Sequence, residues 1–201
     1  MRVICFTVCL AAVAMPVNAD VLTFEDDYPG FVEAAGPLSE IDFETLPDGS
    51  PSMSSVEITD TFNYDDQGVH FSAPFPYPYI AGNPESGFDL QVFQNFEDTW
   101  IIGDLITPAQ AVGGFFGGTT ELCAFDDIGS EIACVIYSDP GPGNFVGIVS
   151  DVPIHSLTFS DGTNSESIDA FVFSPVPEPG TLALIGSGVL LLIRRRVCRR
   201  R

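Results

Sequence analysis

Residues 121–137, ELCAFDDIGSEIACVIY, indicate the fold class most clearly. Two apolar stretches flank a polar segment whose centre, Ile128-Gly129, is typical of a tight turn between antiparallel strands. With the turn centred there, Cys123 and Cys134 face each other across the two strands. The pair lacks the C-x-x-C spacing of a catalytic dithiol. In an exported protein this pair is expected to form a structural disulfide, which for so short a loop is worth at most ~3 kcal/mol.

The same kind of pattern extends through residues 20–175, where short apolar stretches alternate with Gly, Pro and Asp. One short helix is predicted at 29–35, with Asp27 near its start and Gly36 at its end. Strands are predicted at 40–44, 55–63, 69–72, 88–94, 100–106, 111–116, 121–125, 132–137, 145–149, 154–159 and 167–173. Strands at this spacing predict an all-β fold, a single jelly-roll-like β-sandwich with one short N-terminal helix.

The charge distribution is unusual. The chain has 28 acidic and 7 basic residues, a net charge of -21, and no lysine. Its arginines are Arg2 and six residues within 194–201, so residues 3–193 contain neither Lys nor Arg. This excludes a nucleic-acid partner, which needs clustered basic residues. The 27 acids between 20 and 175 must be solvated, capped by backbone N–H groups or neutralised by cations, so salt or divalent ions should stabilise this body.

The N-terminus has the features of a secretory signal peptide. Met1-Arg2 precedes an apolar run at 3–15, and Val17-Asn18-Ala19 offers small residues for cleavage before Asp20. The run is too short for a transmembrane helix. Residues 1–19 are therefore predicted to be a signal peptide and 20–175 an exported acidic β-sandwich body.

The C-terminus has three parts in order: Val176-Pro177-Glu178-Pro179-Gly180, an apolar run at 181–193, and the arginines of 194–201. The run predicts a short hydrophobic transmembrane helix. As a helix its 13 residues span roughly 20 Å, less than the ~30 Å hydrocarbon core, which makes it a poor permanent anchor. The arginines should remain cytoplasmic.

This order of triplet, short apolar helix and terminal arginines resembles the PEP-CTERM sorting signal of Gram-negative bacteria over residues 176–201. The resemblance implies recognition of Pro177, Glu178 and Pro179 by an exosortase, a membrane-embedded cysteine protease. It also implies secretion machinery as a partner, transient anchoring in the inner membrane, then release to the cell surface or extracellular space, in association with exopolysaccharide. The alternative is an ordinary single-span anchor with a Pro-rich stalk.

Catalytic motifs are absent from the body. It has no G-x-S-x-G, no S-x-x-K and no cysteine with a clear histidine partner, which predicts a protein that is not an enzyme. With 27 acids, carboxylate pairs are too common to nominate a catalytic one. No cofactor is predicted other than a possible structural calcium ion.

Calcium is suggested by Ile41-Asp42-Phe43-Glu44 and Ile168-Asp169-Ala170-Phe171, in which acids alternate with apolar residues. The body is loosely similar here to jelly-roll carbohydrate-binding modules, which place calcium between their first and last strands. That resemblance implies Glu44 and Asp169 as ligands. The alternative is a set of outward carboxylates on half-buried strands.

Aromatic residues suggest a sugar-binding surface. Residues 73–79 alternate proline with Phe75, Tyr77 and Tyr79, and the prolines favour an extended, stiff loop outside any central strand. With Trp100, these rings could form a platform for sugars. The alternative is that they cover the end of the core.

Three functions therefore remain open: a non-catalytic surface or matrix protein, a specific calcium-dependent carbohydrate-binding module, and, least favoured, a secreted hydrolase.

Overall fold

The computed structural model describes residues 20–52, 56–74, 77–82, 91–95, 100–138, 143–160 and 166–175. The predicted signal peptide and C-terminal helix lie outside these ranges. The elements in chain order are β1 (Val21–Glu25), α1 (Tyr28–Ala35), β2 (Ser39–Ile41), β3 (Val56–Glu57), the 3-10 turn η1 (Asp65–Gln67), β4 (Val69–Ser72), β5 (Tyr79–Gly82), β6 (Gln91–Asn95), β7 (Ile101–Phe116), β8 (Thr120–Phe125), β9 (Glu131–Tyr137), β10 (Asn144–Ser160) and β11 (Glu166–Pro175). The all-β prediction with one short helix is confirmed.

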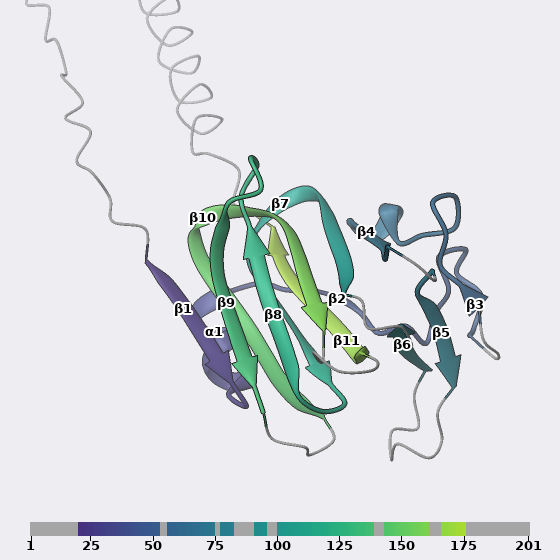
Figure 1. Ribbon diagram of the computed structural model, residues 1–201, viewed down its shortest axis with the longest axis horizontal. Coiled ribbons are helices and arrows are strands. Elements are labelled where there is room, and N and C mark those ends of the chain that lie inside the picture. Colours follow the sequence, from purple (N-terminus) through teal and green to yellow (C-terminus); the bar gives the residue numbers. More distant parts are fainter. Residues whose placement is uncertain are drawn as a thin grey trace, which may run out of the picture.

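Within the described residues, eleven strands join into one sheet that folds into two layers (Figure 1). The long strands β7 and β10 pair with each other near both of their ends, with register shifts between, and belong to both layers. The first layer contains β1, the first half of β10, the second half of β7, β11, β2, β6, β5 and β3. The second layer contains β9, β8, the second half of β10, the first half of β7 and β4.

Prolines occur where the two long strands pass between layers. The pairing of β10 with β7 shifts register between Val149 and Ile154, around Pro153, and Pro108 lies in the corresponding part of β7. Proline lacks the N–H that a regular ladder needs, and bulges bend strands. The sequence analysis divided each strand in two at these positions. The structure corrects this, because each pair of predicted strands is one bent strand.

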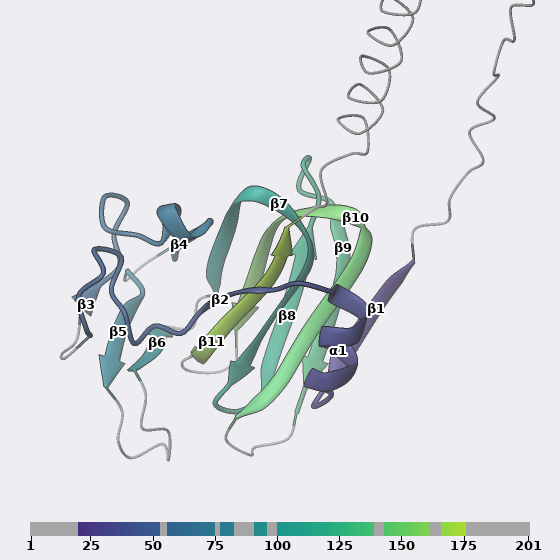
Figure 2. The ribbon, with the colours of Figure 1, turned by 180° about the vertical axis from the view of Figure 1, so that it is seen from behind.

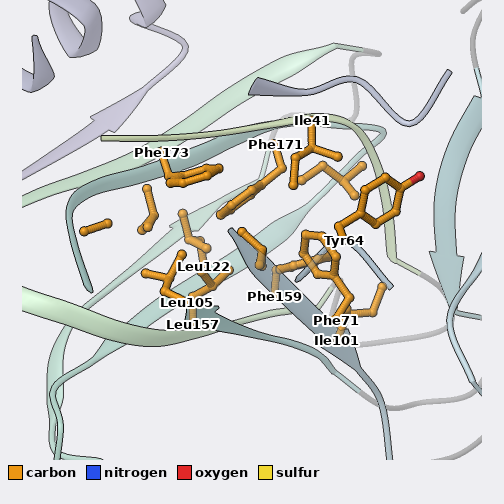
Figure 3. Close-up of a cluster of buried hydrophobic side chains, with 14 of the residues drawn as sticks. Ile41, Tyr64, Phe71, Ile101, Leu105, Leu122, Leu157, Phe159, Phe171 and Phe173 are labelled. Carbon is orange, nitrogen blue, oxygen red and sulfur yellow. The ribbon is translucent and has the colours of Figure 1, made fainter. Parts of the chain in front are cut away.

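The main core lies between the two layers (Figure 3). Phe171 and Phe173 from β11 in the first layer lie opposite Leu157 and Phe159 from β10 in the second. Phe71 from β4 packs edge-on against Phe171, with 5.7 Å between ring centres. The inward residues are almost fully buried, so this seam supplies most of the apolar burial that stabilises the sandwich.

A smaller apolar cluster covers the other face of the first layer, where α1 packs (Figure 2). Asp27 caps α1 by accepting a hydrogen bond from the Gly30 N–H at 3.0 Å. Phe31 is fully buried, and its ring lies 4.9 Å from that of Phe145 on β10. The part of the first layer formed by β1, β7, β10 and β11 is thus covered on both faces, whereas α1 does not cover the second layer.

The predicted hairpin is confirmed. Cys123 of β8 pairs with Cys134 of β9, and the two form a disulfide with their Cα atoms 4.1 Å apart. Gly129, in the turn, has φ +77°, which glycine adopts without strain. Strands β1 and β5 were not predicted. Among the described residues, no helix is long and apolar enough to cross a membrane.

Candidate functional site

Trp100 lies on the outer face of the second layer, away from the core. It immediately precedes β7, where Ile101 points inward, so alternation along the strand directs Trp100 outward. The side chain is 57 % exposed, unusual for the only tryptophan of the chain. The predicted sugar-binding role of Trp100 is therefore sterically available.

Trp100 borders a hollow of about 360 Å³, here called the Trp100 hollow. In the described part of the chain, its other lining residues come from two adjacent strands: Glu121, Cys123 and Phe125 from β8, and Thr158 and Ser160 from β10. The register places Thr158 opposite Cys123 and Ser160 opposite Glu121. The hollow thus combines an indole and a phenyl ring with one carboxylate and two hydroxyl groups.

The sequence analysis did not nominate Glu121, Thr158 or Ser160. The signal was present in Leu157-Thr158-Phe159-Ser160, where apolar and hydroxyl residues alternate as on a half-buried strand. Sequence could not show that β8 lies beside this strand and adds Glu121 to the same face.

Glu121 lies beside the disulfide, with a carboxylate oxygen 3.8 Å from Cys123 Sγ. A disulfide sulfur carries no hydrogen, so this contact is not a hydrogen bond. The oxygen and the two sulfurs of Cys123 and Cys134 form a group within 4.8 Å of one another. A disulfide sulfur is not a thiolate, which is the form of cysteine that binds metals, so we do not assign a metal to this group.

The other predicted aromatic residues lie elsewhere. Tyr77 is 47 % exposed, and Tyr79 opens β5, where it pairs with Glu57 of β3 and Gln94 of β6. Burial raises the pKa of the Tyr79 phenol. Phe75 is outside the described residues. Neither Tyr77 nor Tyr79 lines the Trp100 hollow, so the structure does not gather the predicted platform around it.

The predicted calcium ligands lie at a second place, beside β2 and β11. Phe171 of β11 pairs with Ile41 of β2 in an antiparallel ladder. Beyond this pair, the β11 segment leads to Asp169, and the segment after β2 leads to Asp42 and Glu44 at the same end of the ladder. With Glu40, these residues form what we call the acidic cluster. Strand pairing thus brings together two segments that are more than a hundred residues apart in sequence.

Electrostatics identify Asp169 as the distinctive member of the acidic cluster. Burial, together with the negative charges of Glu44, Glu40 and Asp42, raises the pKa of Asp169 to about 6. Its Oδ1 atom is buried and has no hydrogen-bond partner among the described residues. Uncompensated burial of a carboxylate oxygen is costly, and a cation would relieve the cost.

The chain around Glu44 is held in an uncommon conformation. Phe43 is fully buried against Tyr64 and Phe71, yet has φ +55°, which is rare for an aromatic residue. An Asp42 carboxylate oxygen accepts a hydrogen bond from the Glu44 N–H at 3.1 Å. The turn therefore exposes Asp42 and Glu44 while anchoring Phe43 in the core.

The donor set of the acidic cluster fits a hard cation such as calcium, which prefers several oxygen ligands. Among the described residues, the cluster does not form three carboxylate oxygens all within 4.8 Å of one another. Glu44 and Asp169, as predicted, and Asp42 would be the residues to hold the ion.

The predicted sorting residues Pro177, Glu178 and Pro179 lie outside the described residues. They follow directly after β11, the last strand of the sandwich, which ends at Pro175.

Comparison with protein families finds one match: the model of the PEP-CTERM protein-sorting motif matches residues 175–201. The chain thus carries this motif, as predicted. No match was found among curated proteins.

Several solved structures are similar to the chain. The lectin domain of lectinolysin, complexed with Lewis b antigen, is 16 % identical with a TM-score of 0.36, over 42 % of this chain and 72 % of that domain. A Streptococcus pneumoniae fucose-binding module is 10 % identical with a TM-score of 0.35, over 70 % of this chain and 93 % of that module. The family 32 carbohydrate-binding module of C. perfringens NanJ, in complex with galactose, is 12 % identical with a TM-score of 0.35, over 60 % of this chain and 99 % of that module. These scores are too low to support an inference about this chain.

Proposed function

We propose that the chain is a non-catalytic surface or extracellular matrix protein of a Gram-negative bacterium, sorted by an exosortase and associated with exopolysaccharide. The match of residues 175–201 to the PEP-CTERM motif is the observation that carries this proposal. The Cys123–Cys134 disulfide supports it, because such bonds persist mainly in oxidising, extracytoplasmic compartments.

The body supplies two features that suit a glycan-associated protein. The Trp100 hollow is open to solvent and combines aromatic and hydroxyl groups. Among the described residues that line it, Glu121 supplies a carboxylate that can accept hydrogen bonds from sugar hydroxyls. These groups suit binding of a glycan.

The sorting step is tested by replacing Pro177, Glu178 and Pro179 together with alanine in the native host. The variant should remain in the inner membrane at its unprocessed length, because the exosortase would no longer recognise it. Immunoblots of membrane, surface and medium fractions measure this. Replacing Thr181 and Ser187 with alanine, outside the triplet, is the control. Normal surface release of the triplet variant would refute the sorting proposal.

Calcium binding by Glu44 and Asp169 is part of the alternative proposal, a calcium-dependent carbohydrate-binding module. The buried, unpartnered Oδ1 of Asp169 is the observation that favours it. Calcium should raise the melting temperature of the full-length chain in detergent micelles above its value in chelator. An unchanged melting temperature would end this idea.

The least favoured alternative, a secreted hydrolase, would use Asp169, whose pKa burial and the neighbouring carboxylates raise to about 6. A general acid must be protonated near neutral pH, and a raised pKa allows this. The test is incubation with the host's exopolysaccharide followed by measurement of new reducing ends. Reducing ends that appear with the parent and not with Asp169→Asn would establish the hydrolase, and none with either would exclude it.

A further inference from the structure

We propose that the Trp100 hollow binds one ring of an uncharged polysaccharide. This inference rests on the proposed function and deepens it, because it names the site and the chemical class of the glycan.

The position of the hollow leaves it free for a ligand. Its residues lie on strands whose opposite faces carry the core: Leu122 and Ala124 on β8, and Leu157 and Phe159 on β10, are all fully buried. In Figures 1 and 2, α1 lies beside β1 and β10 of the other layer, behind β9 as seen in Figure 1. The exposed indole of Trp100 is therefore not a core residue left partly uncovered at a sheet edge.

The lining of the hollow matches the chemistry of a sugar ring. A pyranose ring has an apolar face of C–H groups that packs on an indole, with hydroxyl groups around its rim. Trp100 and Phe125 supply apolar surface, and Glu121, Thr158 and Ser160 supply groups that bond hydroxyls. A volume of about 360 Å³ is at the lower end of the range for small-ligand sites, and it has room for one sugar ring.

Charge selects among glycans. Residues 3–193 contain neither Lys nor Arg, so the body has no such side chain to pair with a uronate, sulfate or phosphate group. Glu121 lies in the hollow itself and would repel an anionic sugar, which adds discrimination against that class. The ionised carboxylate accepts hydrogen bonds, and neutral sugar hydroxyls donate them. The hollow therefore favours an uncharged glycan.

Trp100 makes the test site-specific, because it is the only tryptophan in the full-length chain. Its emission is titrated in detergent micelles with neutral hexaoses of glucose (β-1,4 and α-1,4), mannose and xylose. Hexamers of galacturonate and mannuronate are titrated in parallel, each with and without EDTA. At least one neutral hexaose should shift the emission saturably, and the acidic hexamers should bind at least tenfold more weakly in EDTA.

Variants separate the hollow from the rest of the surface. For the neutral hexaose that binds, calorimetry should show at least a tenfold loss of affinity for Trp100→Ala and Glu121→Gln, with circular dichroism unchanged. Ile106→Ala, an exposed residue on the same strand outside the hollow, should bind as the parent does. Unaltered affinity in Trp100→Ala, no binding of any neutral hexaose, or equal binding of acidic hexamers in EDTA would overturn the inference.

Co-sedimentation with the host's exopolysaccharide distinguishes this failure from failure of the proposed function. If the parent and Trp100→Ala both co-sediment, exopolysaccharide association stands and the Trp100 hollow is not its site. If neither co-sediments, the association itself fails. If only the parent does, both are supported.

Discussion

Asp169 is subject to opposing effects that depend on what surrounds it. Without a cation, its charged form is disfavoured by burial and by Glu44, Glu40 and Asp42, which raise its pKa to about 6. With calcium bound, the charged form would be the ligand, and the same carboxyl would be held ionised. A single substitution therefore has effects of opposite sign in chelator and in calcium.

We predict that Asp169→Asn stabilises the chain in EDTA at pH 7.5 and reduces its response to calcium. Raising the pKa of Asp169 from 3.8 to about 6 would by itself lower the free energy of unfolding at pH 7.5 by about 3 kcal/mol. Solvent screening at this partly exposed carboxyl reduces the effect to about 1 kcal/mol. Because the folded pKa exceeds the unfolded value of about 3.8, the folded state holds more protons between these values. The free energy of unfolding of the parent should therefore fall by this amount as pH rises from about 4 to about 6, and that of Asp169→Asn should not.

Urea unfolding of the parent and Asp169→Asn from pH 3.5 to 8 checks this. Asp127→Asn is the control, because Asp127 is exposed and lies in the turn between β8 and β9, outside the cluster. Identical pH dependence in the parent and Asp169→Asn would contradict the prediction.

Single residues of the candidate site were partly predictable from sequence. Asp169, Glu44 and Trp100 were nominated, and the structure places the first two in one cluster and the third on an open face. Glu121, Thr158 and Ser160 were not, because their role depends on which strands are neighbours. Alternation fixes the face on which a residue lies, but pairing between distant strands is set by the whole fold.

At the level of elements, hairpins and caps were predictable, and long bent strands were not. Asp27 caps the start of α1 and Gly36 caps its end, as predicted, because capping acts within one turn of the chain. The predicted breaks in the two long strands fall at Pro108 and Pro153. In the structure, β7 and β10 bend there together and carry the sheet from one layer to the other. Each of them is one continuous strand because the two pair with each other, and the local sequence pattern does not show this pairing.

Gly147 on β10 determines how closely α1 approaches the first layer. A Cβ atom there would lie 2.6 Å from Cδ2 of Phe31 and 2.9 Å from the Phe145 ring, both in buried aromatic groups. We predict that Gly147→Ala costs about 1–3 kcal/mol, because the helix must shift or the rings must leave their preferred rotamers. Urea denaturation of the full-length chain measures this.

Leu22→Ala is the matched control for Gly147→Ala, because Leu22 is half exposed on the adjacent strand β1. It should change the free energy of unfolding by less than about 0.5 kcal/mol. A stability of Gly147→Ala equal to that of the parent would show that α1 is not packed as closely as the structure has it.

At the scale of the whole molecule, charge is the dominant feature. The body between 20 and 175 carries 27 acids, and no Lys or Arg lies within it to form a salt bridge. In the described part of the body, His70 Nδ1 lies 2.7 Å from an Asp65 carboxylate oxygen, and this contact is an ion pair only when the histidine is protonated. The fold must therefore rely on apolar burial and backbone hydrogen bonds against a general repulsion.

We predict that sodium chloride stabilises the chain through this repulsion. The screening length falls from about 10 Å at 0.1 M salt to about 3 Å at 1 M, so distant carboxylates should cease to repel. In EDTA at pH 7.5, the melting temperature should rise steadily from 10 mM to 0.5 M salt, by about 2–4 °C for each kcal/mol of repulsion screened. At pH 4, where many carboxyls are protonated, the increment should be smaller. A melting temperature that is flat or falls with salt at pH 7.5 would contradict this. Since Asp169→Asn removes one charge of many, it should keep nearly all of the salt effect while losing its calcium response, which separates general screening from a specific cation site.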